Sequence, residues 1–251
     1  MEFSKVQTLD GYNANSNGGR SYLIGSEYYF TTNNGDPEYD DAGNATGSSN
    51  CGQGKLYSMN LDTEEITDYG EFFNYEEYKK RFPEATICTY FWGRNENTLY
   101  FMVSIGTSSH CLDEVYTFDM NTKKIEKIAD KRLVCVGDGY IVYLMANGEY
   151  GVLDVFRENE FKLIIENIET GEIIEGPEIT YYNLATICDK KLWYDGKCYD
   201  IASGKEVVVN DLLGASAIGM YENNYIIRGY DEKGQEIFEK VPCEEIDKLF
   251  E

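Results

Sequence analysis

The chain has 251 residues, enough for one large domain or two small ones. Its hydrophobic content of 42%, with 14% aromatic residues, excludes a disordered acidic protein and allows a real core. The formal net charge of -23 opposes phosphate backbones and anionic lipid surfaces, so we expect no nucleic-acid partner.

The chain begins with MEFSKVQTLD, which lacks the apolar stretch of a secretory signal, and no apolar run reaches the ~18 residues of a spanning helix. We therefore expect no membrane insertion, and either a cytoplasmic protein or an exported one whose signal has been trimmed. The seven cysteines do not have the spacing of a disulfide framework or a zinc site. A single histidine argues against multi-His metal binding and His-based catalysis.

Two kinds of β-hairpin alternate along the chain. The first kind begins near residues 21, 86, 132, 185 and 216, and its first strand carries a small residue: Gly25, Cys88, Cys135, Cys188 and Gly219. The second kind sets two alternating strands around a polar turn, at 57–69, 116–128, 164–176 and, more loosely, 197–209. Short polar residues and glycine favour such turns. Two hairpins make a unit of four strands, which is typical of a β-propeller blade.

The hairpin count predicts one all-β domain over residues 1–251, a five-bladed β-propeller of about 50 residues per blade. The last blade lacks a fourth strand of its own. Residues 3–10 belong to no other hairpin, so we expect this N-terminal strand to complete the last blade and close the ring. The small residues of the first strands then pack where five strands converge on a narrow axis, and cysteine serves there as a small apolar residue.

A resemblance to a known family is carried by GSEYYFTTNNG at 25–35, GKLYSMNLDTEEI at 54–66 and GYIVYLMANGEYG at 139–151. These stretches resemble bacterial β-propellers of unknown function that are distantly similar to the low-density-lipoprotein-receptor type. The resemblance implies the propeller fold and supplies no catalytic set. The chain departs from the receptor type because it lacks a repeated Tyr-Trp-Thr-Asp motif and has five expected blades instead of six.

Long insertions gather on one face of the predicted ring, which is where function usually concentrates. The loop 32–54 carries four carboxylates that suit a hard cation, and Asp36, Glu38, Asp40 and Asp41 are candidate calcium ligands. Their spacing is not that of an EF-hand, so we expect a solvated acidic loop and no cofactor, with a calcium site as the alternative.

The linker 70–84 on the same face has a helix cap at Asn74 and a stop at Pro83, which predicts a short helix. Its aromatic residues either pack on the face or form a platform for a sugar ring. The predicted ligand-binding residues are Tyr39, Phe73, Tyr75, Tyr78 and His110. His110 is not expected to activate Cys111, because adjacent residues of a strand point to opposite sides.

Three functions are consistent with these features. The first is a non-catalytic binding module that engages a glycan or a protein partner through the loop-rich face. The second is a glycoside hydrolase with carboxylates around the central pocket, which requires two suitably spaced carboxyl groups, and no pair stands out in the sequence. The third is a structural or assembly role. The sequence leaves the oligomeric state open, and we predict no catalytic residue.

Overall fold

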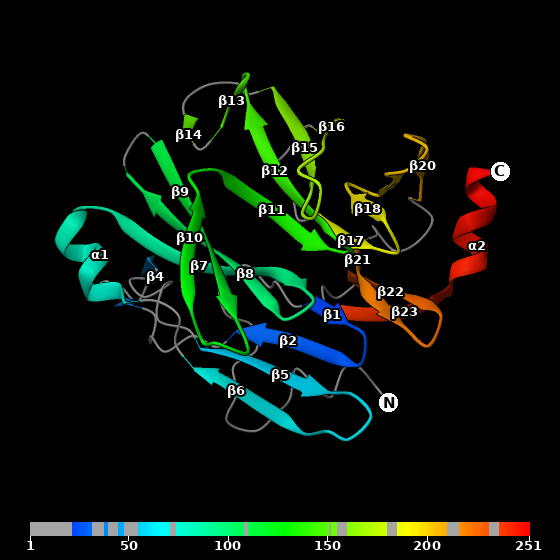
Figure 1. Ribbon diagram of the computed structural model, residues 1–251, viewed down its shortest axis with the longest axis horizontal. Helices are drawn as coiled ribbons and strands as arrows, with labels where there is room; N and C mark the ends of the chain where they lie inside the picture. The colour runs from blue at the N-terminus through cyan, green and yellow to red at the C-terminus, as the bar shows by residue number, and fades with distance from the viewer. Residues whose placement is uncertain are drawn as a thin grey trace.

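The computed structural model describes residues 22–31, 38–39, 45–47, 55–70, 74–107, 110–150, 152–154, 160–179, 185–209, 216–230 and 236–251 (Figure 1). This part of the chain is all-β apart from α1 (Tyr75–Arg81), α2 (Cys243–Asp247) and a 3-10 helix η2 (Lys248–Phe250). None of the helices in these ranges is long and apolar enough to cross a membrane.

The described strands form antiparallel meanders, four of them with four strands and one with three. The first two are β1 (Tyr22–Ile24), β2 (Glu27–Thr31), β5 (Leu56–Asn60), β6 (Ile66–Gly70), and β7 (Thr86–Asn95), β8 (Thr98–Gly106), β9 (His110–Asp119), β10 (Ile125–Ala129). The next two are β11 (Arg132–Gly137), β12 (Tyr140–Ala146), β15 (Phe161–Asn167), β16 (Ile173–Ile179), and β17 (Thr186–Cys188), β18 (Lys191–Tyr194), β19 (Lys197–Asp200), β20 (Glu206–Val208). The last is β21 (Ser216–Tyr221), β22 (Asn224–Tyr230), β23 (Glu236–Pro242).

Four short strands lie outside these meanders. A small hairpin is formed by β3 (Glu38–Tyr39) and β4 (Ala45–Gly47), while β13 (Glu149–Tyr150) pairs with β12 and β14 (Val152–Asp154) pairs with β9. The pairing of β14 with β9 ties the third meander to the second.

The first strands of the meanders lie next to one another around a common axis (Figure 1). Two neighbouring pairs are joined as parallel strands, β1 to β21 at Leu23 and Gly219, and β7 to β11 at Gly93 and Val136. In addition β17 contacts both β11 and β21, and β1 contacts β7. The succession of first strands returns to its starting point, which is the arrangement of a β-propeller.

Backbone crowding between first strands explains two of the glycines. A Cβ at Gly219 would lie 1.9 Å from the Leu23 carbonyl oxygen, and one at Gly93 would lie 2.2 Å from that of Val136. Both have φ values open mainly to glycine, +151° and +135°. Gly219 therefore has the predicted packing role, whereas Gly25 lies in a turn with open space around it.

The core lies between facing meanders. Four apolar clusters fill the interfaces and join residues of different meanders. A fifth packs α1 against the second meander. The predicted packing cysteines agree with this arrangement in two cases, since Cys135 and Cys188 are buried free thiols, while Cys88 is half-buried. The N-terminal stretch 3–10, predicted to close the ring, lies outside the described residues.

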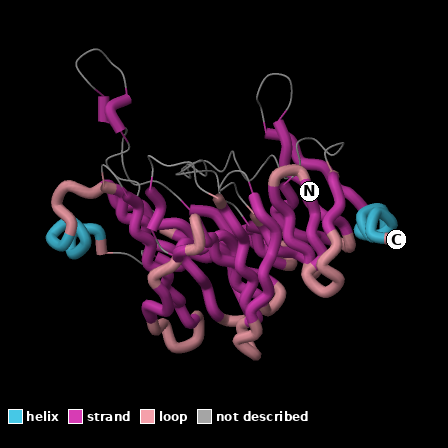
Figure 2. Tube along the Cα trace, turned by 90° about the horizontal axis from the view of Figure 1, so that it is seen from above, coloured by secondary structure: helices cyan, strands magenta, loops and turns pink. Residues whose placement is uncertain are grey.

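The four hairpins of the second kind share one type of turn. The last residue of the third strand is Asn or Asp, and its side chain accepts hydrogen bonds from the turn, as at Asn60, Asp119, Asn167 and Asp200. A later turn residue has positive φ: Glu64, Lys123, Gly171 and Gly204. Figure 2 shows tight turns gathered along the lower edge of the disc-like molecule, which we call the short-turn face.

Candidate functional site

A cavity of about 380 Å³ lies on the axis at the short-turn face. All the described first strands contribute to it, and Leu23, Val136, Ile187 and Ile218 supply apolar walls. Polar residues at the ends of these strands and in the turns after them also line it: Arg94, Asn95, Glu96, Asp138 and Asp189. An apolar interior with a few convergent polar groups is the usual composition of a small-ligand site.

The polar lining is held in place by hydrogen bonds between meanders. Asn95 Oδ1 accepts from the Gly139 amide at 3.1 Å, and Asp138 Oδ2 accepts from the Lys190 amide at 3.1 Å. Each of these acceptors therefore fixes the first turn of the next meander. A cavity mouth built this way is stiff, because its side chains are part of the contacts that hold the meanders together.

Arg94 joins the second meander to the first. Its Nη1 donates to the Tyr29 hydroxyl at 2.8 Å, and its Nε donates to the Glu96 carbonyl. Burial is the main cause that raises the pKa of Tyr29 above its ordinary value, so the phenol stays neutral and able to accept this bond.

Asp189 is the most heavily bonded acid of the lining. Its Oδ2 accepts from Lys191 Nζ at 3.0 Å and from the Tyr225 hydroxyl at 3.1 Å. Lys191 also pairs with Asp247 of α2 at 3.1 Å. Burial would lower the pKa of Lys191, but its bonds to the two aspartates outweigh this and raise it, so the lysine stays charged.

Deeper in the cavity, Thr186 and Cys188 are 8% and 7% exposed. Burial, followed by the nearby carboxylates of Asp138 and Asp189, raises the pKa of the Cys188 thiol well above its ordinary value. Cys188 is therefore a neutral thiol at physiological pH and a poor nucleophile.

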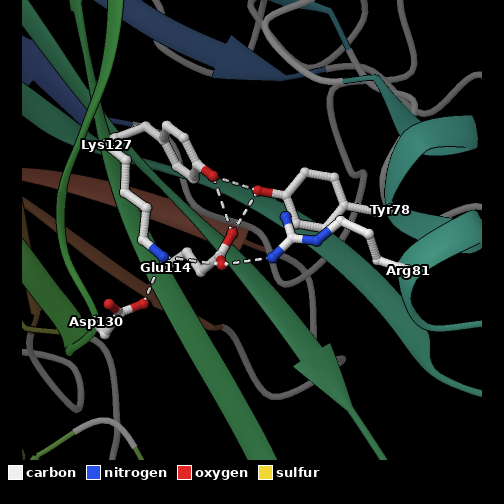
Figure 3. Close-up of polar contacts among 6 residues, drawn as sticks. Tyr78, Arg81, Glu114, Lys127 and Asp130 are labelled. Atoms are coloured by element: carbon white, nitrogen blue, oxygen red, sulfur yellow. Dashed lines mark hydrogen bonds and ion pairs between the residues drawn. The ribbon is translucent and has the colours of Figure 1, made fainter.

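A second polar cluster fastens α1 to the second meander (Figure 3). The Tyr78 hydroxyl donates to Glu114 at 2.5 Å, Lys127 Nζ donates to the same carboxylate at 2.9 Å, and Arg81 Nη2 pairs with it at 3.3 Å. Tyr116 also donates to Glu114, at 2.9 Å. Burial would raise the pKa of Glu114, but these hydrogen bonds lower it to about 2.

The polar cluster holds a helix that lies within the linker 70–84. The predicted helix is present as α1, and the Asn74 side chain caps it by accepting from the Glu77 amide at 3.3 Å. Tyr78 is 8% exposed and bonded to Glu114, so its ring packs inside instead of lying open for a sugar.

The other residues predicted from the sequence are only partly placed. Tyr75 begins α1, His110 begins β9, and Glu38 and Tyr39 form β3. Phe73, Asp36, Asp40 and Asp41 lie outside the described residues. In the described part of the chain no group of three His, Cys, Asp or Glu side chains could hold a metal ion.

Sequence reasoning missed the lining of the axial cavity. A signal was available, because Arg94-Asn95-Glu96, Asp138 and Asp189 each lie at the end of the first strand of a hairpin of the first kind or directly after it. These residues lie in or next to tight turns, whereas the sequence predicts the site at the longer loops.

No protein-family model matches this sequence, and no curated protein matches it either. Among solved structures, Zg3597, a family 117 glycoside hydrolase produced by the marine bacterium Zobellia galactanivorans, is 10% identical with a TM-score of 0.40; the match covers 89% of this chain and 68% of that one. CoXyl43, a GH43 β-xylosidase/α-arabinofuranosidase from a compost microbial metagenome, is 12% identical with a TM-score of 0.35, over 88% and 77% of the two chains.

The β-propeller domain of Vanderwaltozyma polyspora Nup133 is also similar, with 10% identity and a TM-score of 0.29, over 80% of this chain and 48% of that one. At TM-scores of this size the similarities carry no argument about activity. The propeller-like fold of this chain is established by its own strand pairing.

Proposed function

We propose that the chain is a five-bladed propeller, closed by residues 3–10, and that it is a non-catalytic binding module whose axial cavity takes a glycan end or a sugar-sized ligand. The observation that carries the proposal is the cavity of about 380 Å³, lined by all the described first strands. Its size lies within the roughly 300–1,000 Å³ of small-molecule sites.

The chemistry of the lining supports a sugar. Pyranose rings present apolar C–H faces, which match walls such as Val136 and Ile187, and hydroxyl groups, which match Asp138, Asp189 and Asn95 at the mouth. The lining is held by hydrogen bonds between meanders before a ligand arrives. Preorganisation of this kind reduces the ordering cost of binding.

Thermal melting against a panel of neutral oligosaccharides tests the proposal. A ligand at ~100 times its dissociation constant stabilises by about 2.7 kcal/mol, which raises the melting temperature by roughly 5 to 10 °C for a chain of this size. Asp138→Asn is expected to reduce the shift, and Asp130→Asn is the matched control, since Asp130 is exposed and outside the cavity. A panel without any shift would contradict the proposal.

The second candidate is a glycoside hydrolase, favoured by the two carboxylates of Asp138 and Asp189 on one cavity. Retaining and inverting enzymes need carboxyl groups about 5–5.5 or 6.5–9.5 Å apart. Incubation of a bound glycan with the protein, followed by product analysis, distinguishes the two functions. Release of products that depends on both carboxylates would establish hydrolysis, and an unchanged glycan would establish binding alone.

Two predictions concern the loop-rich face. A protein or glycan partner there, and calcium held by Asp36, Glu38, Asp40 and Asp41, both stay predictions, since most of these side chains lie outside the described residues. Melting with calcium and with a chelator tests the metal site, and a shift lost in the quadruple Asp/Glu→Asn/Gln variant would support it.

A further inference from the structure

The lining of the axial cavity indicates which kind of ligand it takes. Its carboxylates favour a cation, and Thr186 favours an atom that can form a hydrogen bond. Resting on the function proposed above, we propose that the ligand is a hydroxylated amine, with its cationic nitrogen at the mouth beside Asp138 and Asp189 and a hydroxyl or ring oxygen at Thr186.

The sign of the charge follows from the lining. Glu96, Asp138 and Asp189 supply three carboxylates, and Arg94 is the cation among the lining residues. Lys191 also pairs with Asp189, but it is shared with Asp247, so these two aspartates and their lysine keep a net negative charge. The Arg94 guanidinium is already committed to the Tyr29 hydroxyl and the Glu96 carbonyl. The whole chain has a net charge of -23, which adds a long-range attraction for cations and a repulsion of anions.

The two aspartates have one oxygen available each. In the described part of the chain the hydrogen bonds to Asp138 and Asp189 reach Oδ2 in both residues. Both residues are exposed at the mouth. Their carboxylates lie close enough to the buried Cys188 thiol to help raise its pKa. An ammonium group can therefore donate to Oδ1 of either residue without breaking the bonds that hold the turns.

Thr186 is the independent sign of a polar ligand. It lines the cavity, is 8% exposed, and its hydroxyl has no hydrogen-bond partner among the described residues. A ligand oxygen that enters the cavity can bond to this hydroxyl in place of water. An alkylamine without oxygen atoms would satisfy the carboxylates and leave Thr186 unbonded.

The test compares three sugars that share one ring and differ in charge: glucosamine, glucose and glucuronic acid, titrated at pH 7 by calorimetry. We expect glucosamine to bind about tenfold or more tightly than glucose, and glucuronic acid to bind most weakly, because the contact with a carboxylate is charge-assisted. Asp138→Asn should reduce the preference for glucosamine, while Asp130→Asn should leave it unchanged.

A second set of measurements tests the hydrogen bond to Thr186. Thr186→Val keeps the shape of the side chain, and we expect it to weaken glucosamine and glucose alike by about tenfold. Butylamine, which has the charge without the oxygens, should bind more weakly than glucosamine, and equal binding would overturn the role of Thr186. Melting of each variant without ligand shows whether it is folded.

The outcomes also separate this inference from the function on which it rests. Equal binding of glucose and glucosamine, or tighter binding of glucuronic acid, would overturn the charge preference and leave a sugar-binding cavity in place. Failure of every sugar and of butylamine would overturn both proposals.

Discussion

Tyr221 donates its hydroxyl to Asp62 at 2.7 Å although the two residues are 159 positions apart. The bond joins the last meander to the first. Equivalent inter-meander bonds link Tyr29 to Arg94, Asn95 to Gly139, Asp138 to Lys190, and Asp189 to Tyr225. Every neighbouring pair of meanders is thus connected by a polar contact as well as by its apolar interface.

Deletion of residues 1–10 tests the closure of the ring. Because β21 already pairs with β1 and Tyr221 reaches Asp62, we expect the shortened chain to fold. We also expect a lower melting temperature, since a strand that completes the last blade would be lost along with its protection of β23. Circular dichroism checks the fold and a thermal scan checks the stability. An unchanged melting temperature would show that this segment is not part of the ring.

Gly219→Ala should be severely destabilising, by roughly 2 to 5 kcal/mol, because the new methyl overlaps the Leu23 carbonyl at a φ that alanine avoids. Gly148→Ala is the control. Gly148 has φ +81° and nothing within 4 Å of an added Cβ, so only the backbone strain of about 1 to 2 kcal/mol applies. Urea unfolding of both variants compares the losses, and equal losses would contradict close approach of the first strands.

The hairpins, the helix and its cap are predictable from the sequence because their signals are local. The turn caps at Asn60 and Asp119 lie two and three residues from the amides they bind. The cavity is different, because Arg94, Asp138 and Asp189 meet only when separate meanders close on one axis. Likewise nothing near Gly93 in the sequence shows that Val136 will lie against it.

Glu64→Gly should stabilise the protein slightly, by about 0.5 to 1 kcal/mol. Glu64 has φ 60°, a strained value for a residue with a Cβ, and the equivalent residues of two other hairpins are Gly171 and Gly204. Glu65→Gly next to it serves as the control and should destabilise, because Glu65 has no positive φ to relieve. Denaturant midpoints measure both changes, and a loss of stability in both variants would contradict the strain.

Lys191→Met should cost about 1 to 3 kcal/mol of the free energy of unfolding. Lys191 is 8% exposed and bridges Asp189 to Asp247, so the variant leaves a half-exposed aspartate on each side without its cation. The comparison is Lys55→Met, whose 3.6 Å pair with Asp68 is exposed and should contribute under about 1 kcal/mol. Similar losses in the two variants would show that Lys191 does not anchor α2.

Glu114→Gln tests the cluster that holds α1. The pKa of Glu114 falls from 4.5 to about 2 in the folded chain, so its contribution is complete above pH 4.5 and is lost as the pH falls toward 2. At neutral pH we expect a loss of roughly 3 kcal/mol. Near pH 2 the variant and the natural chain should differ much less, since Glu114 then becomes protonated in the folded natural chain as well.

Urea unfolding at neutral and acidic pH gives this pH dependence directly. Glu222→Gln is the control, because Glu222 forms an exposed ion pair with Lys240 at 2.9 Å and should change stability little at either pH. A constant difference between Glu114→Gln and the natural chain at all pH values would mean that the carboxylate is not ionised in the cluster. In that case Tyr78 would hold α1 by packing alone, and Tyr78→Phe would leave the stability unchanged.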